Sequence, residues 1–240
     1  MLVKFLRLIV ILVGCLAASH SVAQPILLGD WLAKYPTLDF RLVLTLNKVS
    51  IKGHHTSYSG TLASANQGGV PIAIQSCTVS KDSVYIVFGG NNAIYNARII
   101  SGDTEELRGK YTLGTSSVDL VFRKAEKYEG TIDLGTTKRP MVFKIARSPE
   151  GMLLATMVSP SQSPNEIPAN EVMYIGGHLS LDFAHVQAGY DGVFSEDHKV
   201  LDGTFKQGKD YPLLLERTTQ QVNWHPVSSK RSGRALRLKK

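Results

Sequence analysis

The sequence predicts an all-β protein made of two tandem antiparallel up-and-down β-barrel units, and three observations lead to that prediction. Apolar residues occupy every second position in several short runs, which is the period of a strand with one buried face. Turn-forming glycine, proline, asparagine and aspartate separate these runs at intervals of about 8–12 residues. The same landmarks then recur about 95 residues further along the chain, which indicates a duplicated unit.

The alternating runs define the expected strands. They comprise Leu42, Leu44 and Leu46; Val84, Ile86 and Phe88; Met141, Phe143 and Ile145; and Leu179, Leu181 and Phe183. A buried face and a wet face on each strand are typical of antiparallel sheets. We expect about seven or eight strands in each copy, curled into a barrel because closure removes unpaired edges. One merged barrel or a sandwich is the alternative.

Glycine, aromatic and proline positions carry the repeat and keep their order. Gly109-Lys-Tyr111 recurs as Gly203-Thr-Phe205, at an offset of 94 residues. The other matched positions are Phe88 and Tyr95 with Phe183 and Tyr190, Ser64 and Gln67 with Ser159 and Gln162, and Val70-Pro71 with Ile167-Pro168, the last after two extra residues in the second copy. We therefore expect barrel repeat 1 over residues 31–125 and barrel repeat 2 over residues 127–218.

The first 23 residues have the three-part pattern of a secretory signal peptide, with two basic residues, an apolar run and then small residues. We expect cleavage between Ala23 and Gln24. The sequence Leu12-Val13-Gly14-Cys15 resembles a bacterial lipobox, so lipidation of Cys15 is the alternative. The mature protein is thus expected to be periplasmic or secreted, or else a lipoprotein anchored to the membrane.

The net charge of +7 belongs to the ends of the chain. Residues 8–229 carry 19 basic and 20 acidic side chains, whereas residues 230–240 carry six basic side chains and no acidic one. Nucleic acid is therefore not an expected partner, because no basic face with interleaved aromatics is predicted on the folded part. We expect a disordered tail over residues 219–240. There are two alternatives for this tail. It makes weak contact with an anionic membrane surface or polysaccharide, or it is the remnant of a linker to a lost hydrolase.

The chain has two cysteines, which excludes a disulfide-dense scaffold and a zinc site built from four cysteines. Cys77 lies among Ile72, Ile74 and Val79 in the sequence. We expect it to be a buried structural thiol and not a nucleophile.

Four segments carry residue types found in catalytic or metal sites. They are His54-His55; His178, His185 and His198; Ser159 to Ser163 with Glu166; and Asp197 to Asp202. Adjacent histidines on a strand point to opposite faces, and the other three lack a metal-binding spacing. The aspartates lack the alternating oxygen ligands of a calcium loop, and the serine segment corresponds to a loop in the first copy. We expect no catalytic residue, metal site or cofactor.

The second copy also contains an ordered series of short motifs. They are Ser159-Pro-Ser-Gln162, Ile167-Pro168, Tyr190-Asp-Gly192, Leu201-Asp-Gly203-Thr-Phe-Lys-Gln-Gly208 and Pro212-Leu-Leu-Leu-Glu-Arg217. This series resembles the lipocalin-like β domain that precedes the catalytic domain of many exported bacterial α/β-hydrolases of the serine peptidase and esterase type. The resemblance covers the second copy well and the first loosely, and Ser161 and Ser163 replace the family's Asp and Gly. It implies two lipocalin-like barrels and supplies no catalytic residue.

The hydrolase itself is not encoded in these residues, since no Gly-x-Ser-x-Gly nucleophile elbow occurs. We therefore predict an exported, non-catalytic interaction or accessory module, with an exported α/β-hydrolase or another envelope protein as its partner. Binding of a small apolar ligand in a barrel mouth and a remnant of a truncated hydrolase are the alternatives. Short strands favour a barrel filled by its own side chains, and so favour the interaction hypothesis.

Overall fold

The structure is a computed structural model that describes residues 27–38, 40–50, 56–90, 92–102 and 105–218. The predicted signal peptide with Cys15, Ala23 and Gln24 lies outside these residues, as do the His54-His55 pair and the basic tail.

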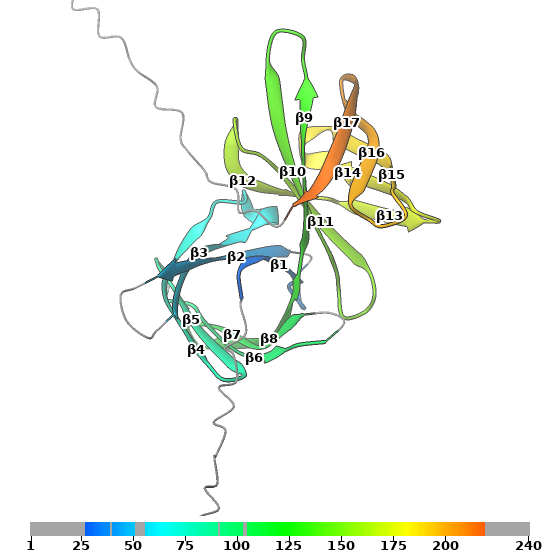
Figure 1. Cartoon of the computed structure of the whole chain (residues 1–240). Coiled ribbons are helices and arrows are strands. Elements are labelled where there is room, and N and C mark those ends of the chain that lie inside the picture. The colour runs from blue at the N-terminus through cyan, green and yellow to red at the C-terminus, as the bar shows by residue number, and fades with distance from the viewer. Residues whose placement is uncertain (1–26, 39, 51–55, 91, 103–104, 219–240) are drawn as a thin grey trace, which may run out of the picture.

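The first copy forms a closed antiparallel barrel whose strands follow one another in sequence order (Figure 1). The strands are β1 (Gly29–Lys34), β2 (Arg41–Ser50), β3 (Thr56–Ser64), β4 (Ile72–Ser80), β5 (Ser83–Phe88), β6 (Ile94–Ile100), β7 (Glu106–Leu113) and β8 (Ser116–Lys124), with a short 3-10 helix, η1 (Ala65–Gln67), before β4. β1 pairs with both β2 and β8, so the meander closes on itself and leaves no edge strand.

The second copy is a curled antiparallel sheet of nine strands. They are β9 (Glu126–Asp133), β10 (Lys138–Arg147), β11 (Leu153–Ser159), β12 (Ser163–Pro168), β13 (Glu171–Ile175), β14 (His178–Phe183), β15 (Ala188–Phe194), β16 (Val200–Gln207) and β17 (Lys209–Thr218), with η2 (Ala184–Val186) before β15. β9 pairs with β17 as β1 pairs with β8, but β12 and β13 are both edges. The predicted pair of barrel-like units is confirmed, while the second unit has one strand more than expected and an open seam.

The seam lies where the second copy departs from the first in sequence. In the first barrel β4 is one strand that pairs with β3 and β5. In the second copy the corresponding stretch is split, because β12 pairs with β11 up to Pro168 and β13 begins only at Glu171. Residues 163–166, which contain the two extra residues, form most of β12, where the first copy has Gly68 and Gly69. Proline cannot donate a ladder hydrogen bond, which suits Pro164 and Pro168 to an edge strand.

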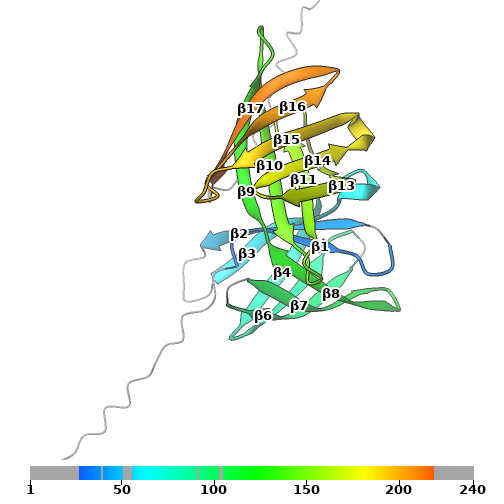
Figure 2. The same cartoon turned by 90° about the vertical axis from the view of Figure 1, so that its right-hand side faces the viewer.

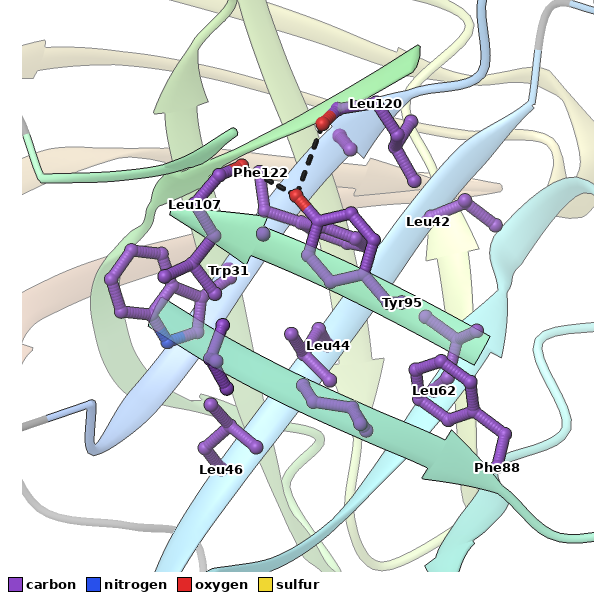
Figure 3. Close-up of a cluster of buried hydrophobic side chains, with 14 of the residues drawn as sticks. Trp31, Leu42, Leu44, Leu46, Leu62, Phe88, Tyr95, Leu107, Leu120 and Phe122 are labelled. Atoms are coloured by element: carbon purple, nitrogen blue, oxygen red, sulfur yellow. Dashed lines mark hydrogen bonds between the residues drawn. The ribbon is translucent and has the colours of Figure 1, made fainter. Parts of the chain in front are cut away.

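The alternating apolar positions face the interior of both units, as predicted. Every member of the four alternating runs is at most 7% exposed. Figure 3 shows the first core, in which the hydroxyl of Tyr95 donates to the carbonyl oxygens of Leu107 at 2.6 Å and Leu120 at 3.0 Å. In the second core the hydroxyl of Tyr190 lies 3.1 Å from the carbonyl oxygens of both Leu201 and Leu213. The repeat therefore preserves a buried tyrosine that ties three consecutive strands together.

Gly109 and Gly203 are needed where the first and second of these strands approach closely. A Cβ atom on Gly109 would lie 2.0 Å from the carbonyl oxygen of Asn96. A Cβ atom on Gly203 would lie 2.1 Å from the carbonyl oxygen of Asp191 and 2.7 Å from the Tyr190 hydroxyl. No side chain fits in either space, which explains why both copies keep glycine at this position.

The two units have separate cores and pack against each other through a third, smaller cluster. In Figure 2 the second sheet stands on the side of the barrel formed by β1 and β2. The contact consists of Leu32, Val43 and Ala63 from the first barrel with Ala146 and Leu154 from the second unit. These residues face outward on their own sheets, so docking of the units and not barrel closure buries them.

Candidate binding surfaces

The interior of the first barrel is a packed hydrophobic core. Trp31, Phe88 and Tyr95 are each at most 1% exposed, and aromatic contacts join the rings of Tyr95 and Phe122 at 5.3 Å between centroids. In the second unit Phe143 contacts both Phe183 and Tyr190. This packing places the surfaces available to partners on the outside of the sheets.

A buried ion cluster joins the two units. The ammonium group of Lys144 on β10 lies 3.0 Å from Asp30 on β1 and 2.5 Å from Glu166 on β12. Thr45 donates a hydrogen bond of 2.6 Å to Asp30, and Thr156 donates one of 2.9 Å to Glu166. Both carboxylates thus have a cation and a hydroxyl as partners. Such partners offset the desolvation free energy that a buried charge costs.

The electrostatics of this cluster favour its ionised form. Burial alone would raise the pKa of Asp30, but the charge of Lys144 and the hydrogen bonds from Thr45 and Lys144 outweigh it and hold that pKa below its ordinary value. Burial alone would lower the pKa of Lys144, but Glu166 and Asp30 raise it well above the usual range for lysine. The geometry suits a structural clamp between the units, since each group is saturated by its neighbours.

A shallow groove of about 500 Å³ crosses the outer face of the first barrel over β6, β7 and β8. Its lining residues are Asn96, Arg108, Gly109, Lys110, Asp119, Leu120 and Val121. Arg98 stands directly opposite Arg108 in the β6–β7 ladder, and Tyr85 stands opposite Asn96 in the β5–β6 ladder. Both Arg98 and Tyr85 are exposed on the same face of the sheet.

The groove has more positive than negative side chains. Glu106 pairs with Arg108 at 2.9 Å and with Arg123 at 2.8 Å, and Lys110 pairs with Asp119 at 2.8 Å. Within the described residues no acidic side chain pairs with Arg98. Two arginines facing each other across a ladder repel one another, so the fold gains nothing in stability from this arrangement.

A second exposed surface lies on the outside of the second unit. One row across the sheet contains Ile175, His178, Val193, Asp202 and Leu214, each directly opposite the next. Ile175 is 69% exposed, Val193 53% and Leu214 48%, and Met173 on the same face of β13 is 57% exposed. We call these four apolar residues the β13–β17 apolar row. Met173 and Ile175 are neighbours on β13, whereas His178 and Asp202 lie between Ile175, Val193 and Leu214 in the row.

The three histidines of the second copy do not converge on a site. His178 begins β14 and His185 lies in η2 at its other end, so the strand separates them. His198 lies in the β15–β16 turn, where its ring stacks on Phe194 and its carbonyl accepts a hydrogen bond from Tyr128. Among the residues that the structure describes, no three His, Cys, Asp or Glu side chains are arranged to hold a metal ion.

In the segments Ser159 to Ser163 and Asp197 to Asp202, the polar side chains form hydrogen bonds within the protein. Ser159 ends β11 and donates to the carbonyl of Pro140, while Glu166 contacts Lys144 and Thr156 and not a serine. Asp197 accepts hydrogen bonds from the Lys199 ammonium group, from the Ser195 hydroxyl and from the Lys199 backbone, and these hold its pKa below the ordinary value. These contacts shape two turns.

Cys77 is half-buried on β4 and packs against the first core. Burial raises the pKa of its thiol to about 11. A thiol with such a pKa carries little thiolate at neutral pH, which agrees with the structural role expected from its sequence neighbours.

Sequence reasoning missed the ion cluster and both outer surfaces. Asp30, Lys144 and Glu166 come from distant strands, and Lys144 alternates with Phe143 and Ile145 as an outward, solvated residue would. The sequence predicts seven or eight strands in the first copy, but it does not predict the cross-strand register that brings Tyr85, Asn96 and the arginines together. Comparison of surface positions between the two copies was the signal that could have singled out the arginine pair.

No family model matches this chain, and no curated protein matches it significantly. Among solved structures, it is similar to the crystal structure of a Bacteroides fragilis NCTC 9343 protein provisionally described as an outer membrane protein. That match has a TM-score of 0.26 and 11% sequence identity, and covers 79% of this chain and 95% of the other. Within the described part of the present chain, no helix has the length and apolar character needed to cross a bilayer.

Proposed function

We propose that this protein is an exported, non-catalytic interaction module that binds an envelope or secreted protein through the β13–β17 apolar row. The observation that carries the proposal is the exposure of four large apolar side chains on one outer face while the barrel interior is filled. A filled interior supports protein binding over storage of a small apolar ligand, since a ligand would have to displace packed side chains.

The first copy serves as an internal reference for this surface. When the strand pairing of the two copies is compared, Thr78 of the first copy takes the position of Met173 in the second, and Arg98 takes the position of Val193. Three of the four apolar side chains of the row are therefore not required by the barrel fold, because the first copy has Thr78, Ser80 and Arg98 in place of Met173, Ile175 and Val193, whereas Leu214 corresponds to Val121. Retaining them in water is unfavourable unless a partner covers them.

Charge indicates the kind of surface that fits the row. Exposed acidic residues, Glu171, Asp182 and Asp202, lie on the same face. Residues 126–218 as a whole carry thirteen acidic and nine basic side chains. The partner proposed here is a folded exported protein, an α/β-hydrolase being one candidate, that presents an apolar patch with basic residues around it. An apolar centre with a polar rim is the ordinary anatomy of such an interface.

Site-specific photocrosslinking in cells tests this proposal. A photoreactive amino acid at Met173 should form an adduct with one exported protein that mass spectrometry identifies, whereas the same probe at the equivalent first-copy position, Thr78, should not. The two purified proteins should then bind each other, and the Ile175→Ser and Val193→Ser pair should weaken the affinity at least tenfold. The control is the double variant Ile100→Ser with Leu113→Ser, which removes exposed apolar surface from the first copy. It should leave the affinity unchanged.

Three results would overturn the proposal. The first is the absence of any adduct at Met173, and the second is equal labelling from both probe positions. The third is an adduct with a second copy of this chain alone, because the row would then be a self-association surface.

A further inference from the structure

We propose that the groove on β6–β8 of the first barrel, together with Tyr85, binds an acidic polysaccharide through its carboxylate groups. This surface is separate from the β13–β17 apolar row, so the inference does not depend on the proposed protein partner. Its residues come from consecutive strands, Tyr85 on β5, Asn96 and Arg98 on β6, and Arg108 and Lys110 on β7.

The comparison between the two copies shows that these residues are not needed for folding. Ladder register makes Arg98 and Arg108 equivalent to Val193 and Asp202, which stand opposite each other in the second unit. Lys110 is likewise equivalent to Thr204. The inward positions, by contrast, are kept in both copies, as the two buried tyrosines and their carbonyl acceptors show. The facing arginines are thus specific to the first copy, and Glu106 pairs with Arg108 but not with Arg98.

The charges point to a carboxylate-bearing ligand. A guanidinium group binds a carboxylate with two parallel hydrogen bonds. Glu106 is shared between Arg108 and Arg123, and Arg98 is exposed and has no acidic partner among the described residues. Arg98 is therefore available for a bidentate contact, and Arg108 on the neighbouring strand can add a second cation to the same anionic group.

The neutral residues indicate a sugar and not a membrane surface. Tyr85 is 42% exposed and offers a ring face against which the C–H face of a pyranose can pack. Asn96, directly opposite it, supplies an amide that can both donate to and accept from hydroxyl groups. Val121 and the inward-facing Leu120 are the apolar residues of the lining, which provides little surface for acyl chains.

The shape of the groove fits a chain-like ligand. Tyr85 and Lys110 lie on strands two apart, a separation of about 10 Å at the usual strand spacing. A ligand that touches the tyrosine ring and the cations together is therefore larger than one sugar ring. The groove is also open and shallow, whereas a small isolated molecule is usually held in a cavity that encloses most of its surface.

Isothermal titration with linear uronate oligosaccharides, oligogalacturonate and oligoalginate, tests this site on the full chain. At least one should bind the wild-type protein, and its methyl-esterified, uncharged form should bind at least tenfold more weakly. Replacing both arginines, Arg98→Gln with Arg108→Gln, should weaken binding at least tenfold. Removing two charges from the second unit, Lys138→Gln with Lys209→Gln, should change the affinity less than twofold. Tyr85→Ala should weaken binding at least threefold while Tyr85→Phe should not.

Each alternative ligand gives a distinct outcome. The proposed site would be refuted if neither uronate binds. It would also be refuted if the two double variants weaken the affinity for the oligosaccharide equally. Binding of vesicles containing phosphatidylglycerol, with neither uronate bound, would overturn the sugar in favour of a lipid headgroup. Inorganic phosphate that displaces the oligosaccharide at millimolar concentration, with no effect of Tyr85→Ala, would show that the groove recognises anions without recognising a sugar.

Discussion

Replacing Lys144 by methionine should destabilise the protein through the two carboxylates that it neutralises. Asp30 and Glu166 lie 3.0 and 2.5 Å from the ammonium group and are buried at the interface between the units. Methionine keeps most of the side-chain volume but leaves two buried acids without a counter-charge. Breaking a buried ion pair from one side typically costs about 3–5 kcal/mol, and we expect Lys144→Met to lower the free energy of unfolding by that amount.

Urea denaturation followed by circular dichroism and by tryptophan fluorescence, to which buried Trp31 contributes, provides the measurement. The control is Lys138→Met, the same change at an exposed position on the same strand, which should cost less than about 0.5 kcal/mol. Neutralising the whole cluster, with Asp30→Asn and Glu166→Gln added to Lys144→Met, should restore at least half of the loss because no uncompensated charge remains. A cost below about 1 kcal/mol for Lys144→Met would refute the reasoning and show that water reaches the cluster.

The same cluster predicts how stability depends on pH. The pKa of Asp30 is lowered in the folded state, so its contribution is present above its unfolded pKa of about 4 and is lost as the pH falls through the native value. The pKa of Lys144 is raised, so its contribution is complete below about pH 10 and declines as the pH rises through the native value. The neutralised variant should lack both dependences.

Four further predictions follow from the fold and from the sequence. Phe183→Ala should cost about 3–5 kcal/mol by leaving a cavity in the second core, and should lower the unfolding transition of the second unit first; a cost under about 0.5 kcal/mol would mean that the side chain is exposed. Tyr190→Phe should cost about 1–3 kcal/mol, measured in urea, because two buried carbonyl groups lose their donor. Fluorophosphonate probes should leave the purified protein unlabelled; stoichiometric labelling abolished by Ser159→Ala would identify a nucleophile. Mass spectrometry of the exported protein should find an N-terminus at Gln24 or a lipidated Cys15, and an unprocessed chain in the cytoplasm would contradict export.

The strands, the repeat and the inward faces were determined by the sequence itself. Side chains alternate across a strand, so the spacing of Leu179, Leu181 and Phe183 directly specifies which face is buried. The recurring glycine at 109 and 203 marks a close backbone approach that no other residue fits. These are local constraints, and each is visible within a few residues of the chain.

Closure of the sheets and burial of the charges were decided only by the tertiary structure. Whether β12 and β13 act as one strand depends on hydrogen bonding to β11 on one side and β14 on the other, which a local pattern does not encode. Lys144 lies on the outward face of its own sheet and becomes buried because β1 of the other unit supplies Asp30. The groove likewise arises from the ladder register that sets Arg98 against Arg108. Contacts between strands far apart in the chain depend on how the sheets curve and dock, and this geometry is a property of the whole fold.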